Sequence, residues 1–327
     1  MMLEIKWGII GCGAVTEKKS GPAFNKVSNS RLVAVMRRDA EKAADYAQRH
    51  HVPKWYTDAH VLIKDPEVNA VYIATPPLQH EEYALAAIEA GKSVYVEKPV
   101  SINALATQRM IDAAVANNVK LSVAHYRRAQ PMFLKIKQLL EERVVGDVRF
   151  VNLKMLKATN PDLIAKSATN WRMDPTISGG GLFHDLAPHQ LDLMLYYFGA
   201  PEKFSGISCT QQGGATADDL VVGNILFKNG IAFNGTWCFS VAADDEKDVC
   251  EIYGSKAVLR FPVFGYEATI ASKGVAKKYE FEPLEHVQQP MIQKVVNYFL
   301  DKGPNPSSGE NALLSMQIMD AFTHKKK

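Results

Sequence analysis

The first 124 residues alternate between short apolar runs and longer amphipathic segments. Each apolar run has the length of a buried strand, and each segment between two runs is long enough for a helical crossover. Because parallel strands need such crossovers, the alternation predicts a parallel sheet covered by helices on both faces. The expected strands are 3–10, 31–36, 69–75, 93–96 and 119–124, and the expected helices are 39–51, 79–90 and 103–118.

The pattern changes after about residue 125, where several strands follow one another through short turns. Short turns join antiparallel strands, so this half predicts an antiparallel sheet, with a type I′ hairpin at Asn229-Gly230. We therefore expect two domains, 1–124 and 125–327. The second should contain helices at 131–142, 179–198, 286–300 and 310–324, and strands at 148–157, 203–211, 220–227, 231–239, 248–253 and 257–261.

Composition narrows the class of protein. The 327 residues are 47% hydrophobic and 22% charged, which fits two globular domains. A net charge of +3 is too small to predict nucleic-acid binding. No apolar stretch approaches the roughly 20 residues of a membrane span, and the N-terminus does not resemble a signal peptide. The four cysteines and the histidines show no metal spacing, so we expect a cytoplasmic protein without a metal.

A glycine turn follows the first expected strand. Gly11 and Gly13 match the first two glycines of the dinucleotide fingerprint, and Thr16 replaces the third Gly or Ala. Gly11 permits a tight turn, and Gly13 allows a pyrophosphate to approach the backbone at the start of the next helix. An ordinary strand-to-helix turn is the alternative, but the position on the first strand favours a dinucleotide site. Its expected residues are Gly11, Cys12, Gly13, Ala14 and Val15.

The second expected strand ends in two arginines. Proteins that bind NAD usually have an acidic residue near the position that Arg37 occupies in this chain. That residue accepts hydrogen bonds from the adenosine ribose. The planar fork of arginine donors suits a phosphate instead. We therefore expect Arg37 and Arg38 to hold the 2′-phosphate of NADP(H). The alternative is that both arginines are solvated and NAD binds through Asp39.

Two further motifs become informative together with these glycines. One is Glu97-Lys98-Pro99, which directly follows an apolar strand, and the other is GGGLFHDLAPHQLD at 179–192. Ala74-Thr75-Pro76-Pro77 with His80, and Trp171-Arg172, extend the match over nearly the whole chain. In these motifs the chain resembles the glucose–fructose oxidoreductase and inositol dehydrogenase family, often called Gfo/Idh/MocA.

The resemblance implies an N-terminal Rossmann domain and a C-terminal α/β domain with an open, mainly antiparallel sheet that often forms a dimer face. It implies a catalytic lysine at Lys98, followed by a cis bond to Pro99, and a catalytic histidine at His189 with Asp185 as its partner. A homodimer or homotetramer is expected. Further residues expected at the cofactor are Thr75, Pro76, His80, Glu97, Lys98 and Arg172.

The same side chains suit hydride transfer to or from an alcohol. Lys98 is expected at the carboxyl end of a parallel strand, where such sheets bind ligands. Asp185, His189 and Asp192 are spaced by four and three residues, so a helix places them on one face. Either Lys98 or His189 could exchange the hydroxyl proton across a cleft between the domains, and the sequence leaves this choice open. The alternatives are an exposed lysine and a buried structural histidine.

The helix that carries His189 contains a proline. Pro188 is tolerated in the first turn, so Asp185 is expected at or before the helix start, with Gly199 after the helix end. Three glycines at 179–181 would let the backbone pass close to a cofactor ring. His184 is expected at the pocket rim. The residues expected to contact substrate are Lys98, Tyr126, Arg127, Trp171, Asp185 and His189.

Two of these assignments have structural alternatives, namely core packing for Trp171 and a hydrogen-bonded domain junction for 125–127. The leading function is an NAD(P)-dependent dehydrogenase or reductase acting on a sugar, polyol or cyclitol, with NADP preferred and NAD as the alternative. A glycosidase that oxidises its substrate transiently with bound NAD is a second hypothesis. A non-catalytic nicotinamide-binding regulator is a third, against which the proton-transfer residues argue.

Overall fold

The computed structural model describes residues 3–159, 171–213 and 216–323. The chain forms two compact units, the first made of Met1–Tyr126 with Leu284–Leu313 and the second of Arg127–Pro283 with Leu314–Lys327. The division into domains at 1–124 and 125–327 stays a prediction, and the compact units assign a late segment of the chain to the first unit. In the described part of the chain, no helix combines the length and apolarity needed to cross a bilayer.

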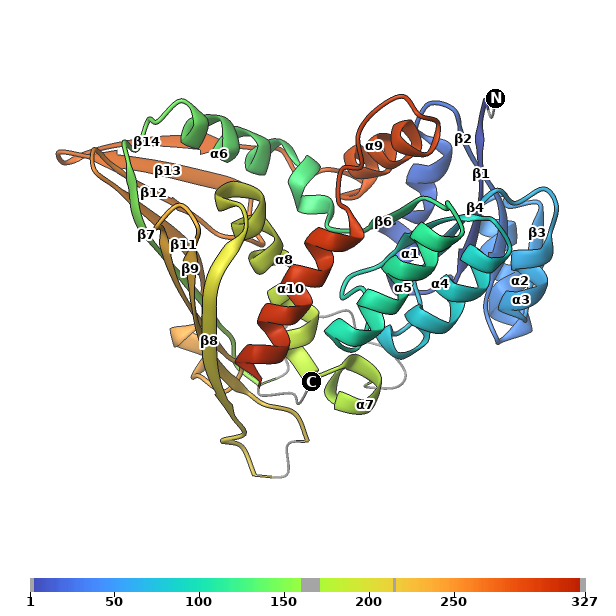
Figure 1. Cartoon of the computed structure of the whole chain (residues 1–327), viewed down its shortest axis with the longest axis horizontal. Coiled ribbons are helices and arrows are strands. Elements are labelled where there is room, and N and C mark those ends of the chain that lie inside the picture. The colour runs from blue at the N-terminus through green and yellow to red at the C-terminus, as the bar shows by residue number, and fades with distance from the viewer. Residues whose placement is uncertain (1–2, 160–170, 214–215, 324–327) are drawn as a thin grey trace. The chain divides into compact units, whose positions relative to one another are not determined.

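The first unit is built on a parallel sheet of six strands. These are β1 (Ile5–Ile10), β2 (Ser30–Met36), β3 (Lys54–Tyr56), β4 (Ala70–Ile73), β5 (Ser93–Val96) and β6 (Leu121–Val123). Their order is β3-β2-β1-β4-β5-β6, and every pair is parallel (Figure 1). The predicted doubly wound sheet is confirmed. Its strand order reverses between β1 and β4, where open α/β sheets bind ligands at the carboxyl ends of their strands.

Polar side chains cap several helices of this unit. Asp39 accepts a hydrogen bond from the Lys42 amide at 3.1 Å, and Asn103 accepts one from the Ala106 amide at 2.9 Å. The helices are α1 (Ala14–Lys18), α2 (Ala40–Arg49), α3 (Ala59–Lys64), α4 (His80–Glu89), α5 (Ala104–Ala116), α9 (Gln289–Phe299) and the start of α10 (Gly309–Phe322). Figure 1 shows α4 and α5 packed side by side. The sequence analysis missed β3 and α3, since elements of three and six residues carry little periodicity.

Aromatic residues fill the core of the first unit. Trp7 packs against Phe24 with ring centres 4.8 Å apart, and Tyr72 stacks on Tyr95 at 5.2 Å. All four side chains are fully buried. Because β4 and β5 are adjacent, this stack also brings the Tyr72 hydroxyl to the buried carboxylate of Glu97, just beyond β5.

The second unit is built on eight strands: β7 (Val148–Leu156), β8 (Pro201–Cys209), β9 (Leu220–Phe227), β10 (Ala232–Cys238), β11 (Lys247–Gly254), β12 (Val258–Phe261), β13 (Glu267–Ser272) and β14 (Val275–Glu280). Their order is β14-β13-β12-β11-β7-β10-β9-β8. The pair β7–β10 is parallel and the others are antiparallel, so the predicted open, mainly antiparallel sheet is confirmed. The sequence analysis missed β13 and β14, of which β14 is an exposed edge strand with little apolar patterning.

Helices cover one face of this sheet. They are α6 (Pro131–Glu141), α8 (Gly181–Phe198) and the end of α10, whereas the short helix α7 (Pro175–Ser178) precedes α8. Trp237 of β10 donates to Gln190 of α8 at 2.9 Å, and Phe322 of α10 fills the space that a Cβ on Gly223 would need. Among the described residues, the opposite face carries no α-helix (Figure 1). Its side chains therefore form an exposed sheet surface.

The hairpin between β9 and β10 differs in its turn type from the prediction. A type I′ turn needs positive φ at both central residues, but only Gly230 has it, at +81°, and Asn229 does not. Phe227 and Ile231 are hydrogen-bonded across residues 228–230, which makes a longer loop. The hairpin itself is confirmed, whereas the type I′ assignment is wrong.

The predicted position of Asp185, at or before the start of α8, is also wrong. The helix begins at Gly181, so Pro188 lies beyond its first turn and Asp185 lies within the helix. Positive φ angles at Gly180 (+156°) and Gly181 (+72°) let the chain enter the helix early. The helix tolerates Pro188 at the loss of one backbone hydrogen bond to the preceding turn. Gly199, with φ of +83°, ends the helix as predicted.

Candidate active site

The glycine turn after β1 has the shape that a bound pyrophosphate requires. Gly11 has φ of +93°, and a Cβ there would lie 2.8 Å from the Thr75 amide nitrogen. A Cβ on Gly13 would instead meet nothing nearer than a carbonyl oxygen at 3.9 Å, so this side of the turn is open. The residues present therefore fit a dinucleotide.

Thr16 takes the place of the third glycine without disturbing the helix start. Its side chain is fully buried, and its hydroxyl donates to the Gly13 carbonyl at 2.9 Å. Cys12 is also buried, and burial raises the pKa of its thiol to about 11. The contribution expected from Cys12 therefore comes from its backbone rather than from a thiolate.

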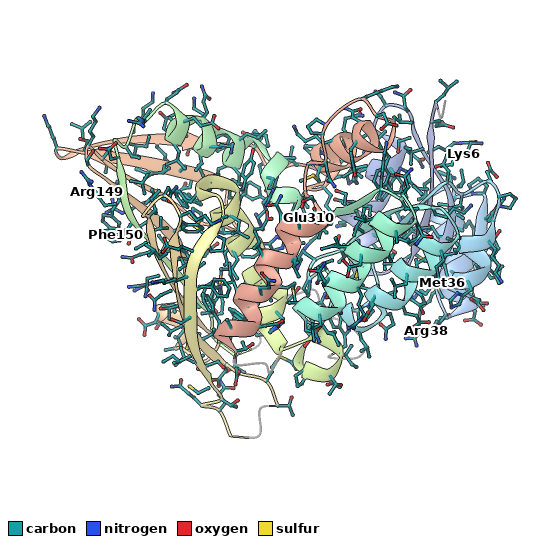
Figure 2. The ribbon with its side chains drawn as sticks, in the orientation of Figure 1. Lys6, Met36, Arg38, Arg149, Phe150 and Glu310 are labelled. Carbon is teal, nitrogen blue, oxygen red and sulfur yellow. The ribbon has the colours of Figure 1, made fainter. Side chains whose placement is uncertain are left out.

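The end of β2 is cationic. The Arg37 guanidinium donates to the Cys12 carbonyl at 3.2 Å, which places it beside the glycine turn. Arg38 is exposed beyond the strand (Figure 2). Asp39 caps α2 and pairs with Lys42 at 2.7 Å, and Lys42 lowers the pKa of this carboxyl. Asp39 is therefore engaged by its own helix, and the contacts predicted for Arg37 and Arg38 with a cofactor stay predictions.

Lys98 follows β5, and its bond to Pro99 is cis, as the resemblance implies. The preceding Glu97 is only 6% exposed. Its Oε1 accepts hydrogen bonds from Tyr72 and, at 2.5 Å, from Gln288, and its Oε2 accepts one from the Lys98 amide at 3.2 Å. The carboxylate is thus held by three donors within the first unit, and direct contact of Glu97 with a cofactor stays a prediction.

His80 links the segments that follow β4 and β5. Its Nε2 lies 2.7 Å from the Thr75 carbonyl oxygen, and its Nδ1 lies 3.0 Å from that of Pro99. Burial lowers the pKa of His80 to about 4, so the ring is neutral near pH 7. Thr75 and Pro76 lie at the same edge as the glycine turn, and the cofactor contacts predicted for these residues stay predictions.

In the second unit, α8 presents the predicted acidic residues around His189. Asp185 accepts a hydrogen bond from Arg172 at 3.1 Å, and the Arg172 guanidinium lies 4.3 Å from the Trp171 ring centre. Asp192 pairs with Arg128 through two contacts of 2.7 Å. Cationic partners therefore hold both carboxylates. Cofactor contact by Arg172 and substrate contact by Trp171 and Asp185 stay predictions.

His189 is 3% exposed, and its ring lies roughly perpendicular to that of Phe264, with the ring centres 5.5 Å apart. The Arg127 guanidinium lies 4.3 Å from the centre of the same half-buried ring. Asp248 fixes this turn by accepting from the Val263 and Phe264 amides at 3.0 and 2.6 Å. Phe264 and Asp248 were not predicted from the sequence. They lie some 60 to 75 residues after His189 of α8, and no local sequence pattern links positions so far apart.

Three residues predicted near the pocket are buried, namely His184, His125 and Tyr126. His184 is fully buried, with Nδ1 3.3 Å from the Gly180 carbonyl oxygen, so its predicted position at a pocket rim is wrong. His184 lies in the first turns of α8, where its ring packs against Gly180 and Phe183. His125 lies 3.2 Å from the Ser307 hydroxyl, within a hydrogen-bonded part of the first unit. Tyr126 is 6% exposed, and its contact with substrate stays a prediction.

Each unit thus gathers part of the predicted site. The first brings the glycine turn, Arg37, His80 and Lys98 to the carboxyl edge of its sheet. The second arranges Asp185 and His189 on α8. In the described residues, no group of three or more His, Cys, Asp or Glu side chains could hold a metal ion.

Comparison with known proteins identifies the class. The chain belongs to the GFO/IDH/MocA oxidoreductase family: the model of its NAD-binding Rossmann fold matches residues 5–125, and that of its C-terminal domain matches 133–260. Oxidoreductase P35 of Formosa agariphila is 49% identical over 98% of this chain and 99% of its own length. The protein is therefore an oxidoreductase with a dinucleotide-binding Rossmann domain, and the predicted family is confirmed.

More distant relatives indicate the chemistry found in the family. Trans-1,2-dihydrobenzene-1,2-diol dehydrogenase of Mus musculus is 28% identical over 90% of this chain and 84% of its own length. The solved aldose-aldose oxidoreductase of Caulobacter crescentus shares the fold, with a TM-score of 0.84, 21% identity and coverage of 98% and 96% of the two chains. The family therefore includes dehydrogenases that act on hydroxyl groups.

Proposed function

We propose that this protein is an NADP(H)-preferring dehydrogenase or reductase that acts on a ring or chain alcohol of the sugar, polyol or cyclitol class. The observation that carries the proposal is the position of Lys98 at the carboxyl end of β5, on the edge that also bears the Gly11–Gly13 turn after β1. Two strand spacings, about 10 Å, separate these strands. A dinucleotide on the turn can therefore extend along the edge toward the lysine.

The cofactor supplies the hydride acceptor or donor when it is bound. The backbone at Gly11–Val15 would hold its pyrophosphate, and Arg37 and Arg38 its 2′-phosphate. The protein's own side chains then handle the substrate proton. Lys98 or His189 takes this proton when the alcohol is oxidised and returns it when the carbonyl is reduced. Asp185, one helical turn before His189, would orient the imidazole while Arg172 holds the carboxylate.

Two observations support the substrate class. The mouse relative is named for a diol, which is also the arrangement found in sugars and cyclitols. Phe264 offers a half-buried aromatic face beside His189, and such a face suits the C–H surface of a ring. A panel of polyols and keto sugars, followed at the reduced-nicotinamide absorbance band with each cofactor, tests the proposal. Tight cofactor binding without turnover on the whole panel would contradict it.

The cofactor preference can be measured separately. We expect the kcat/KM for NADPH to exceed that for NADH by about 10-fold or more, because each charge-assisted contact to the 2′-phosphate adds binding energy. Arg37→Ala and Arg38→Ala should each reduce this ratio, whereas Asp39→Asn should leave it nearly unchanged. Equal values of kcat/KM for the two cofactors in the wild-type protein would contradict the assignment.

The exposed face of the second sheet supports a homodimer. Phe150 (Figure 2) is 40% exposed and stacks on Tyr253 at 4.6 Å. Ile207 of β8 and Leu226 of β9 are 66% and 36% exposed. Apolar side chains exposed on one face of a sheet are typical of surfaces through which proteins associate. We expect sedimentation at micromolar concentration to show a dimer or a tetramer, and Phe150→Glu to shift it toward smaller species. A monomeric wild-type protein would contradict this part of the proposal.

A further inference from the structure

We propose that Gln288 is a positioning residue for Lys98 and acts through the buried carboxylate of Glu97. The inference rests on the proposed function, in which Lys98 serves at the substrate. Gln288 is separated from Glu97 by 191 residues in the sequence, but its Nε2 donates to Glu97 Oε1 at 2.5 Å. Both residues belong to the first compact unit.

The side-chain amide of Gln288 donates to the Glu97 carboxylate and does not cap its own helix. Gln288 occupies the N-cap position of α9, but its side chain makes no cap hydrogen bond. Glutamine is not among the preferred N-cap residues, so local helix capping does not account for it. The side chain is fully buried, and its Oε1 lies 3.5 Å from the Tyr95 hydroxyl. Its position therefore depends on its contact with Glu97.

Glu97 connects this amide to the backbone of Lys98. Tyr72 and Gln288 both donate to Oε1, and the Lys98 amide donates to Oε2 at 3.2 Å. Two donors fix one end of the carboxylate, so the other end presents a defined acceptor to the Lys98 amide. A buried carboxylate that loses a donor must reorient or admit water. Either change would displace the Lys98 backbone.

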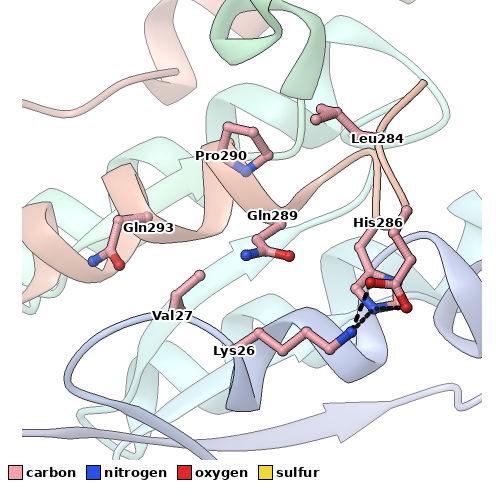
Figure 3. A pocket seen from close by; sticks show the side chains of 8 residues that line it. Lys26, Val27, Leu284, His286, Gln289, Pro290 and Gln293 are labelled. Carbon is pink, nitrogen blue, oxygen red and sulfur yellow. Dashed lines mark hydrogen bonds and ion pairs between the residues drawn. The ribbon is translucent and has the colours of Figure 1, made fainter. Parts of the chain in front are cut away.

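Residues 286–288, which carry Gln288, are hydrogen-bonded to the end of α1. His286 Nδ1 donates to the Lys18 carbonyl at 2.7 Å, which leaves Nε2 to accept from Lys26 at 2.8 Å (Figure 3). The backbone N–H of Gln288 donates to the Lys19 carbonyl at 3.1 Å. Because α1 directly follows the glycine turn, one continuous set of hydrogen bonds joins the dinucleotide loop to Lys98.

Two substitutions test the inference. Gln288→Met keeps the length of the side chain and removes its donor, and Tyr72→Phe removes one hydroxyl and keeps the stack on Tyr95. We expect each to lower kcat by about 10-fold while the Kd for NADPH changes less than about 2-fold, because a small displacement of a reacting group affects turnover more than cofactor binding. In the double variant, the fold-decrease in kcat should be much smaller than the product of the fold-decreases in the two single variants, because both substitutions act on the Glu97 carboxylate.

Tyr56→Phe is the matched control, because it removes a hydroxyl of the same unit that donates to Asp65 and that contacts neither Glu97 nor Gln288. It should keep kcat within about 2-fold. Unchanged kcat in both test variants, multiplicative effects, or parallel losses of kcat and NADPH binding would overturn the inference. If Gln288→Met does not fold, Tyr72→Phe carries the test by the same criteria. Full turnover in Lys98→Met would instead refute the proposed function.

Discussion

Replacing Lys98 with Met should lower turnover by roughly 100-fold or more while the Kd for the cofactor stays within a few-fold. Methionine retains most of the side-chain length but can neither donate a hydrogen bond nor carry a proton. The glycine turn and Arg37, which would hold the phosphates, are unchanged in the variant. Steady-state kinetics and cofactor titration by fluorescence measure the two quantities.

Lys64→Met is the matched control for this experiment, because Lys64 is an exposed lysine at the end of α3 in the same unit. It should leave turnover unchanged. If Lys98→Met kept wild-type kcat, Lys98 would have no role in proton transfer. If it abolished cofactor binding, the lysine would serve the dinucleotide rather than the reacting alcohol.

The second large effect is expected at His189. His189→Ala should also reduce turnover by roughly 100-fold or more with cofactor binding retained. His189 is buried against Phe264, so the truncation also leaves a cavity. His189→Asn fills more of this space, and we expect an equally inactive protein with a melting temperature nearer to wild type.

His184→Asn provides a control on the same helix. His184 is buried like His189, but its Nδ1 lies against the Gly180 carbonyl oxygen, to which an asparagine amide can donate. We expect it to keep most of its turnover. Equal losses in the His184 and His189 variants would show that α8 tolerates no substitution, and wild-type turnover in His189→Asn would remove His189 from the mechanism.

Local signals in the sequence predicted the first unit well. Apolar runs such as 70–74, within the predicted strand 69–75, allow few structures other than a buried strand. The turn after β1 needs glycine because Gly11 has a positive φ angle. Lys98 was found because it follows such a strand within a specific motif. Periodicity does not resolve elements as short as β3, which explains their omission.

Interactions between distant parts of the chain could not be predicted in this way. In the sequence, Gln288 is an ordinary residue within the predicted helix 286–300, and Phe264 is one apolar residue after the last predicted strand. Their roles depend on contacts with Glu97 and His189, which no local pattern encodes. Pro188 misled the analysis for a related reason: a proline is usually a boundary signal, but the packing of α8 outweighs the loss of one hydrogen bond.

The most direct test of the account follows the hydride itself. An alcohol that reacts in the substrate panel would be prepared with deuterium at its carbinol carbon and oxidised by the wild-type protein. Mass spectrometry of the reduced cofactor should then show one deuterium per molecule, and the Lys98→Met and His189→Asn variants should transfer it at least about 100-fold more slowly. Oxidation of the alcohol without label in the cofactor, or undiminished transfer in both variants, would contradict the account.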